Sequence, residues 1–161
     1  MTLEQRIAAV YEEMRMDVFR YVLTLGPSRE TAQDITQDAF IRLYEALHHG
    51  TAIENIRAWL LRVAHNLTIN TVGAKSYTTT EIEESIAATV KTAEDHLIAR
   101  ERQTRLRTEI ERLSAQQRGC LELRAQGLRY REIGEIMGIS TSTVGEFIRR
   151  AVHKLREALY E

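Results

Sequence analysis

The sequence predicts an all-α protein built from two small helical units. One proline and eight glycines in 161 residues leave long stretches rich in Leu, Ala, Glu, Arg and Gln, a composition typical of helical proteins. Apolar residues recur at helical spacing in most of these stretches. An acidic, Ser/Thr-rich segment over 76–95 separates them. We expect it to be a flexible linker between residues 1–75 and residues 96–161.

Residues 1–75 predict three helices. The first keeps helical spacing over 7–25 and stops at Gly26-Pro27-Ser28, where Ser28 can cap the second. The second helix runs to about His48, and the third covers residues 56 to about 72. In the third helix the side chains expected to point inward are Trp59, Leu60, Val63, Ala64 and Leu67.

The second helix has two different faces. Its inward positions are apolar, namely Ala32, Ile35, Ala39, Leu43, Ala46 and Leu47. Its outward positions are Asp34, Gln37, Asp38, Ile41 and Glu45. An acidic face with one exposed isoleucine suits a basic, partly apolar protein partner. Taken alone, the same pattern also fits an ordinary solvated face, which is the commoner case.

Residues 96–161 predict a helix-turn-helix that follows two other helices. A long charged helix over 93–113 is expected to point Leu97, Leu106, Ile110 and Leu113 inward, and a further helix starts at Ser114 and ends near Gly127. The short amphipathic segment Tyr130–Met137 is closed by Gly138, which can adopt positive φ. Ser140 or Thr141 can then cap a second helix that starts at Thr141, leaving its N-terminal amides free for a phosphate.

The helix that starts at Thr141 separates apolar from charged residues. Its apolar stripe consists of Val144, Phe147, Ile148, Ala151, Val152, Leu155 and Leu159. The opposite side carries Ser142, Glu146, Arg149, Arg150 and His153, side chains able to contact base edges and phosphates. We therefore expect this helix to lie in the major groove of DNA. The alternative is a helical hairpin with a solvated charged face.

The charge distribution agrees with a DNA-binding C-terminal unit. The net charge is −1 overall, but it divides into −1 over 1–75, −4 over 76–95 and +4 over 96–161. An acidic segment followed by a basic unit is expected of a DNA reader coupled to a second activity.

Several classes of function are disfavoured by the residues present. Cys120 is the single cysteine, so an intramolecular disulfide or a cysteine-rich metal site is excluded, and we expect a buried packing role. His48 and His49 are adjacent, so their side chains would diverge by about 100° on a helix. They therefore cannot bind one metal ion together, as a pair four residues apart could. Glycine-rich phosphate loops and serine nucleophile motifs are absent from the sequence. We expect neither an enzyme nor a cofactor, and a cytoplasmic protein without a signal peptide or membrane span.

Four blocks of the sequence resemble bacterial sigma factors of the extracytoplasmic-function (ECF) type. Residues 32–40 resemble the family's acidic helix followed by phenylalanine, and residues 59–66 resemble its Trp-Leu…Ala-Xaa-Asn helix. Residues 113–118 resemble its Leu-Pro-Xaa-Xaa-Xaa-Arg entry. Residues 130–140, with Thr143-Val144 and Arg150-Ala151, resemble its DNA-reading helices. The blocks occur in the family's order and cover most of the chain.

The resemblance implies a non-catalytic protein that binds core RNA polymerase and directs it to promoter DNA. Residues 1–75 would be a sigma region 2-like unit that docks on the clamp coiled coil of the largest polymerase subunit and binds the −10 element. Residues 96–161 would be a region 4-like unit that reads the −35 element and meets the flap of the second subunit. An anti-sigma factor is a further partner that the resemblance allows.

The resemblance also implies three sets of contact residues. The core polymerase contacts would be Asp34, Gln37, Asp38 and Ile41. The single-stranded −10 contacts would be Glu54, Asn55, Arg57, Arg62, His65, Asn66 and Asn70. The duplex −35 contacts would be Ser140, Thr141, Ser142, Thr143, Glu146, Arg149, Arg150, His153 and Lys154. Trp59 and Phe40 could stack on bases, but their helical positions favour core packing.

The chain departs from the family pattern at several positions. The stretch after Asn66 has only Lys75 as a basic residue where the family often has several arginines. Glu146 stands where a basic residue is frequent, Gly134 where alanine is frequent, and Ala115 where proline is frequent. The base preference at the −35 element is therefore not transferable. The rival function is a stand-alone helix-turn-helix regulator that binds operators as a dimer, and it would footprint DNA without polymerase.

Overall fold

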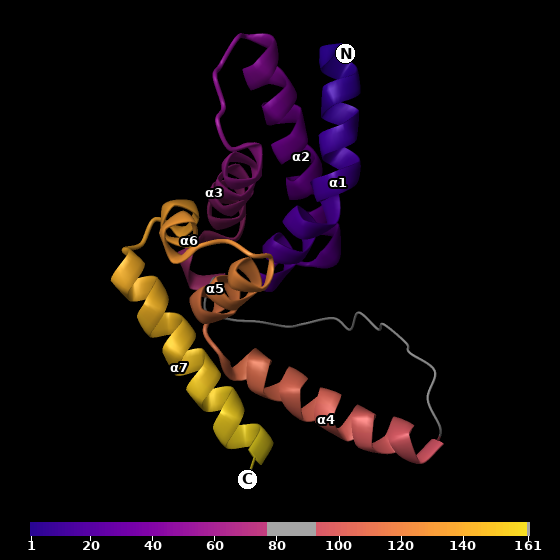
Figure 1. Cartoon of the computed structure of the whole chain (residues 1–161), viewed down its shortest axis with the longest axis vertical. Helices are drawn as coiled ribbons and strands as arrows, with labels where there is room; N and C mark the ends of the chain where they lie inside the picture. The colour runs from indigo at the N-terminus through magenta and orange to yellow at the C-terminus, as the bar shows by residue number, and fades with distance from the viewer. Residues whose placement is uncertain (77–92, 161) are drawn as a thin grey trace.

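The computed structural model describes residues 1–76 and 93–160, and all regular structure within these ranges is helical. The N-terminal unit comprises α1 (Leu3–Thr24), α2 (Arg29–His48) and α3 (Ile56–Ser76). The C-terminal unit comprises α4 (Ala93–Arg112), α5 (Ala115–Ala125), α6 (Tyr130–Met137) and α7 (Thr141–Tyr160) (Figure 1). The all-α prediction is confirmed. The predicted linker falls largely on 77–92, outside the described residues.

Serine side chains begin several of these helices, as the sequence indicates. The hydroxyl of Ser28 accepts a hydrogen bond of 3.2 Å from the backbone N–H three residues on. Ser140 does the same at 3.1 Å at the start of α7. Ser114 and Gln117 form a reciprocal capping box, with bonds of 3.1 and 3.2 Å. These bonds satisfy backbone donors that a helix start otherwise leaves unpaired, and each contributes about 1 kcal/mol.

The N-terminal unit packs around apolar residues at the predicted helical spacing. In α2, Ile35, Ala39 and Leu43 are buried, whereas Ile41 on the opposite face is 51% exposed. The other buried side chains of this unit include Val18, Tyr21, Val22 and Leu25 of α1 and Leu60, Leu61 and Ala64 of α3. Phe40 is also buried, and Trp59 is partly buried against the core, as predicted.

The turn between α6 and α7 depends on two glycines. Gly138 ends α6 in the left-handed region, at φ 71° and ψ 33°. The N–H of Ile139 donates to the carbonyl of Gly134 over 3.0 Å. A Cβ atom at Gly134 would lie 2.6 Å from the carbonyl oxygen of Ile139, so this turn requires the glycine found where the sigma family often has alanine.

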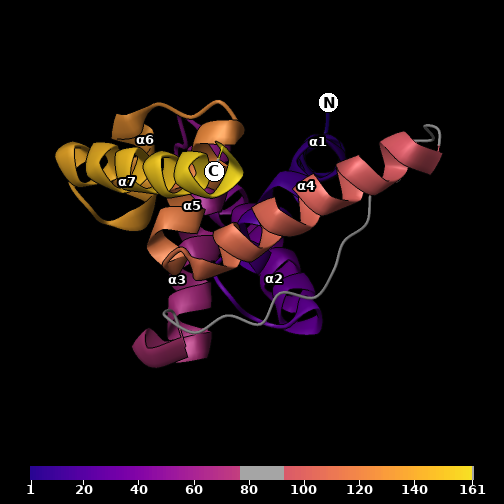
Figure 2. The ribbon, with the colours of Figure 1, turned by 90° about the horizontal axis from the view of Figure 1, so that it is seen from below.

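The first turns of α4 differ from the prediction. α4 packs on α7, but its N-terminal part extends away from the other helices (Figures 1 and 2). Leu97 is 64% exposed and Leu106 is 36% exposed, whereas Leu113 is buried. The prediction that Leu97 and Leu106 point inward is therefore wrong. Helical spacing gives the face of a helix, but it does not show how far the neighbouring helix reaches.

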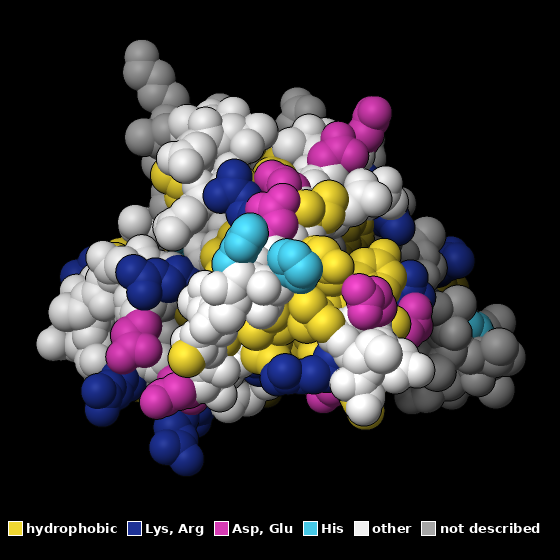
Figure 3. Space-filling view, turned by 90° about the horizontal axis from the view of Figure 1, so that it is seen from above, with side chains coloured by type: hydrophobic (Ala, Val, Ile, Leu, Met, Phe, Trp, Pro, Cys, Tyr) yellow, Lys and Arg dark blue, Asp and Glu magenta, His cyan; other side chains and the backbone are white. Residues whose placement is uncertain are grey.

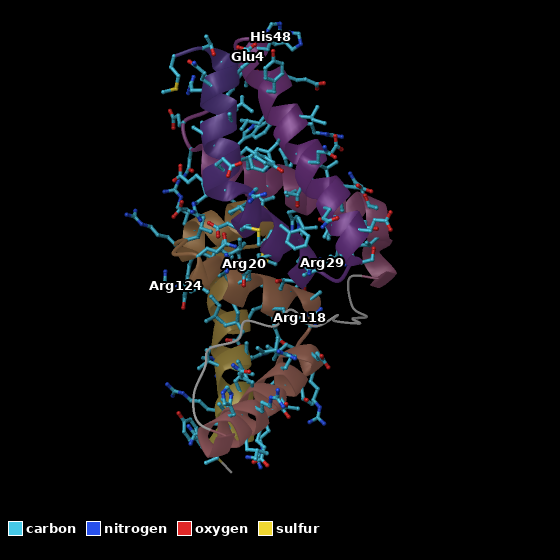
Figure 4. The ribbon with its side chains drawn as sticks, turned by 90° about the vertical axis from the view of Figure 1, so that its right-hand side faces the viewer. Glu4, Arg20, Arg29, His48, Arg118 and Arg124 are labelled. Carbon is cyan, nitrogen blue, oxygen red and sulfur yellow. The ribbon has the colours of Figure 1, made fainter. Side chains whose placement is uncertain are left out.

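Arg118 lies at the junction of the two units (Figure 4). It is 2% exposed, its Nη1 donates to the carbonyl of Leu113 over 2.6 Å, and its Nε donates to that of Thr24 over 3.2 Å. These carbonyl groups stand at the C-terminal ends of α4 and α1, where helices leave acceptors unpaired and the helix dipole favours a cation. Arg118 therefore stabilises two helix ends at once.

Cys120 occupies the same junction as a small packing residue. It is fully buried, and burial raises the pKa of its thiol to about 12. The predicted packing role is confirmed. Within the described ranges, none of the helices combines the length and apolar content needed to cross a lipid bilayer.

Candidate nucleic-acid and protein interfaces

The outer face of α7 presents two arginines held together by one carboxylate. Glu146 Oε1 accepts from Arg149 Nη2 and from Arg150 Nε, each over 2.8 Å. The hydrogen bond from Arg149 holds the pKa of Glu146 below its ordinary value. The three side chains together carry a net charge of +1 and fix two guanidinium groups side by side, an arrangement suited to acceptors on guanine or phosphate.

The remaining predicted residues of this surface surround that cluster. Ser142, His153 and Lys154 are exposed, and His153 Nε2 lies 2.9 Å from a carboxylate oxygen of Glu157. Thr143 is half-buried, with its hydroxyl 2.8 Å from that of Ser140. Thr141 is exposed at the first position of α7. The structure therefore brings together on α7 and its cap all nine residues predicted for the duplex −35 contact.

A second polar surface lies on α3 and the loop before it. Glu54, Arg62, Asn66 and Asn70 are exposed there. Asn55 begins α3, since its Oδ1 accepts from the backbone N–H three residues on over 3.1 Å. Its Nδ2 donates to Glu132 Oε2 of α6 over 3.3 Å.

Two predicted members of this surface are engaged elsewhere. Arg57 Nη2 pairs with Asp17 Oδ2 of α1 over 3.0 Å and is only partly exposed. His65 is 6% exposed, with its Nδ1 2.8 Å from the hydroxyl of Tyr21, and burial lowers its pKa to about 4. The expectation that His65 faces DNA is corrected, because α1 packs on this side of α3 and places Tyr21 against His65.

A cavity of about 290 Å³ adjoins this surface. Its walls come from the loop and α3 on one side and from α6 on the other. The sequence alone does not indicate the contribution of α6, since α6 lies about 75 residues away along the chain. The lining residues are Ala52, Ile53, Glu54, Asn55, Ala58, Trp59, Arg62, Glu135 and Ile136.

The outer face of α2 carries the four residues predicted to contact polymerase. Asp34, Gln37 and Ile41 are exposed, and Asp38 is half-buried with Oδ2 3.8 Å from Arg42 Nε. A neighbouring cavity of about 380 Å³ between α1 and α2 extends this face. Sequence reasoning missed its α1 wall, which includes Tyr11 (38% exposed), Met16 (50% exposed), Arg15 and Phe19.

Glu4 and His48 mark the end of the N-terminal unit that is remote from α7 (Figures 1 and 4). Tyr44 donates a hydrogen bond of 3.2 Å to Glu4 Oε1 and stacks on His48 at 5.8 Å between ring centroids. Seen from this end, histidine and charged side chains border an apolar area (Figure 3). Across the described part of the chain, His, Cys, Asp and Glu side chains form no group of three that could hold a metal ion.

Both halves of the chain match known sequence families. Residues 10–76 match Sigma-70 region 2, and residues 103–155 match Sigma-70 region 4. The N-terminal match ends at the last residue of α3, and the C-terminal match covers α6 and most of α7.

Several characterised proteins are similar over nearly the whole chain. RNA polymerase sigma factor YlaC of Bacillus subtilis is 31% identical over 156 residues, which cover 94% of this chain and 90% of YlaC. The ECF sigma factor SigW of Bacillus subtilis is 31% identical over 140 residues, covering 80% of this chain and 73% of SigW. The ECF sigma factor SigL of Mycobacterium tuberculosis is 28% identical over 164 residues, covering 95% of this chain and 88% of SigL.

The fold is also found in a solved structure. CnrH, in complex with the cytosolic domain of CnrY, superposes with a TM-score of 0.64 at 21% identity, covering 97% of this chain and 88% of CnrH. At this level of identity the likeness concerns the fold.

Proposed function

Because this chain belongs to the ECF group of sigma-70 family RNA polymerase sigma factors, we propose that its three polar surfaces divide the steps of promoter recognition among them. As an alternative sigma factor, it binds core RNA polymerase and directs transcription initiation, a role without catalysis of its own. The stand-alone regulator is not favoured, because both sigma regions are present in order.

The outer face of α2 docks on the clamp coiled coil of the largest polymerase subunit. The supporting observation is the combination of exposed acidic and amide groups with Ile41, which is 51% exposed on an otherwise polar face. A basic helical partner would gain charge complementarity from Asp34 and Asp38 and apolar contact from Ile41.

The surface of α3 binds the non-template strand of the −10 element. Asn55, Asn66 and Asn70 offer donors and acceptors for unpaired base edges, and Arg62 offers a charge for the backbone. The cavity beside Trp59 provides a concave site for an unstacked base, in which apolar side chains such as Trp59 and Ile53 lie beside polar ones such as Asn55. Capturing such a base offsets part of the few kcal/mol that opening the duplex costs, so binding is coupled to melting.

The outer face of α7 reads the −35 element as duplex. Arg149 and Arg150 provide bidentate donors for guanine or phosphate, and Glu146 orients them and can accept from a cytosine amino group. The start of α7 at Ser140 offers amides for a phosphate. Two sites of modest strength in one chain gain affinity through effective concentration. The polymerase flap and an anti-sigma factor are further predicted partners of the chain.

The docking of α2 is tested by co-purification with core polymerase. Asp34→Lys combined with Gln37→Lys should weaken association at least tenfold, about 1.4 kcal/mol, because it reverses the charge of the face. Glu13 is exposed on α1, away from the outer face of α2. The control is Glu13→Lys, because it changes the charge as much as Asp34→Lys alone but at a different surface. Circular dichroism should show unchanged helix content in both. Undiminished binding by the double variant would exclude α2 as the docking surface.

A further inference from the structure

We infer that three side chains of α7 divide the reading of the −35 element: Glu146 and Arg149 read the two bases of one G·C pair, and Arg150 binds a phosphate. This inference deepens the function proposed for α7 and rests on it. Glu146 is then a residue that determines which sequence is bound, and not a further source of affinity. The supporting observation is that its carboxylate bonds the two arginines in unequal ways.

The Glu146 carboxylate fixes the orientation of Arg149 more firmly than that of Arg150. Arg149 donates from Nη2 to Oε1 over 2.8 Å and from Nε to Oε2 over 3.3 Å. Arg150 donates only from Nε, to Oε1 over 2.8 Å. Two parallel bonds set the plane of a guanidinium group, whereas a single bond leaves the group able to turn. Arg149 is therefore the arginine suited to a base edge, which requires a fixed direction.

The outer ends of both guanidinium groups are available to a ligand. Nη1 of Arg149 and both Nη atoms of Arg150 make no hydrogen bond to another residue within the described part of the chain. The two side chains are 68% and 58% exposed. The outer N–H groups of Arg149 form a pair of donors that matches N7 and O6 of guanine. Because Glu146 already holds this side chain in place, Arg149 loses less conformational entropy on binding.

Glu146 keeps an acceptor for the second base of the same pair. Its Oε1 accepts two short bonds, but its Oε2 accepts only the longer one, so Oε2 has a lone pair left. In the major groove a G·C pair presents two acceptors on guanine and the amino donor of cytosine. A pair of donors beside a carboxylate matches this pattern. An A·T pair carries its amino donor on the purine and does not match it.

The same carboxylate disfavours binding to the DNA backbone alone. Two arginines without Glu146 would carry a charge of +2 and bind phosphates at any sequence. With Glu146 the net charge is +1, and the carboxylate repels a phosphate that approaches both arginines. Specificity then comes partly from weakening the competing, sequence-independent contact. Because these ion pairs are exposed, they add little to folding stability, and their main effect is on recognition.

The inference is tested with core RNA polymerase and the full-length chain on a promoter whose distal sequence block is randomised. Counting the transcripts from each sequence gives the preference at every base pair of that block. The variants are Glu146→Gln, Arg149→Gln and Arg150→Gln, all at exposed or half-exposed positions of α7. The matched control is Glu157→Gln, which removes one carboxylate from the exposed pair that Glu157 forms with His153 on the same helix.

The wild type should prefer G·C over A·T at one base pair of the distal block by about tenfold or more. Glu146→Gln and Arg149→Gln should each reduce this preference to about threefold or less at the same base pair, because each removes one half of the readout. Arg150→Gln should lower transcription from all sequences alike and keep the preference. Glu157→Gln should keep the wild-type preference. Glu146→Gln should also steepen the salt dependence of promoter binding, since the added net charge neutralises a further phosphate.

A G·C preference that Glu146→Gln leaves unchanged overturns the inference, while the reading of the −35 element by α7 stands. Loss of the preference in Arg150→Gln, with Arg149→Gln unaffected, overturns the roles given to the two arginines. A wild-type protein that shows no distal block at all overturns the function proposed for α7, and the inference with it. The inference and the proposed function are therefore refuted by different results.

Discussion

His65 should make the stability of this protein depend on pH in a way that one substitution removes. Its pKa lies at about 4 because burial disfavours the charged imidazolium, whereas an unfolded histidine titrates near about 6.5. Between these values the unfolded state binds more protons than the folded state, so stability falls as pH falls. Because each unit of pKa corresponds to about 1.4 kcal/mol, the difference of roughly 2.5 between these two pKa values corresponds to about 3–4 kcal/mol of folding stability across the window.

The substitution His65→Asn keeps a polar atom near the position of Nδ1, within reach of Tyr21, and cannot be protonated. Urea unfolding at several pH values should show that the wild type loses about 2 kcal/mol more than His65→Asn between about pH 7 and about pH 5. His48→Asn removes an exposed histidine and should keep the wild-type profile. Identical pH profiles for wild type and His65→Asn would refute the buried, neutral histidine.

Further predictions concern residues at the junction of the two units and glycines of the backbone. In each case chemical denaturation measures the change in the free energy of unfolding. Arg118→Met should lower the free energy of unfolding by about 2–4 kcal/mol, because it leaves buried carbonyls at two helix ends without a donor. Arg112 is exposed, so the control Arg112→Met should change the free energy of unfolding by less than about 0.5 kcal/mol. Gly138→Ala should destabilise by about 1 kcal/mol or more, since its φ is 71°, whereas Gly145→Ala, within α7, should stabilise by about 0.5–1 kcal/mol. Equal losses within either pair would contradict the geometry described.

Local features of the sequence predicted the helices and the faces they bury. Ser28 and Ser140 mark helix starts because their side chains bond backbone groups only three residues away. Gly138 marks the turn because the left-handed region strongly favours glycine. The spacing of Val144 and Ile148 identifies the buried stripe of α7, since helical geometry fixes it.

Features set by distant contacts could not be predicted in the same way. Gly119 gives no sequence signal of its contact with Leu25, which lies 94 residues earlier. The burial of His65 depends on where α1 places Tyr21. The exposure of Leu97 depends on where α7 ends relative to α4. Each of these outcomes is decided by the packing of separate helices, for which a periodic pattern holds no information.

The division of promoter recognition between the two units is tested most directly by transcription with purified components. Core RNA polymerase, the purified chain and a library of genomic DNA fragments are combined, and the 5′ ends of the transcripts are sequenced. We expect new start sites that share two upstream sequence blocks at constant spacing. Arg149→Ala with Arg150→Ala should erase only the distal block. New start sites that lack a distal block, or a distal block that survives this double variant, would contradict the account.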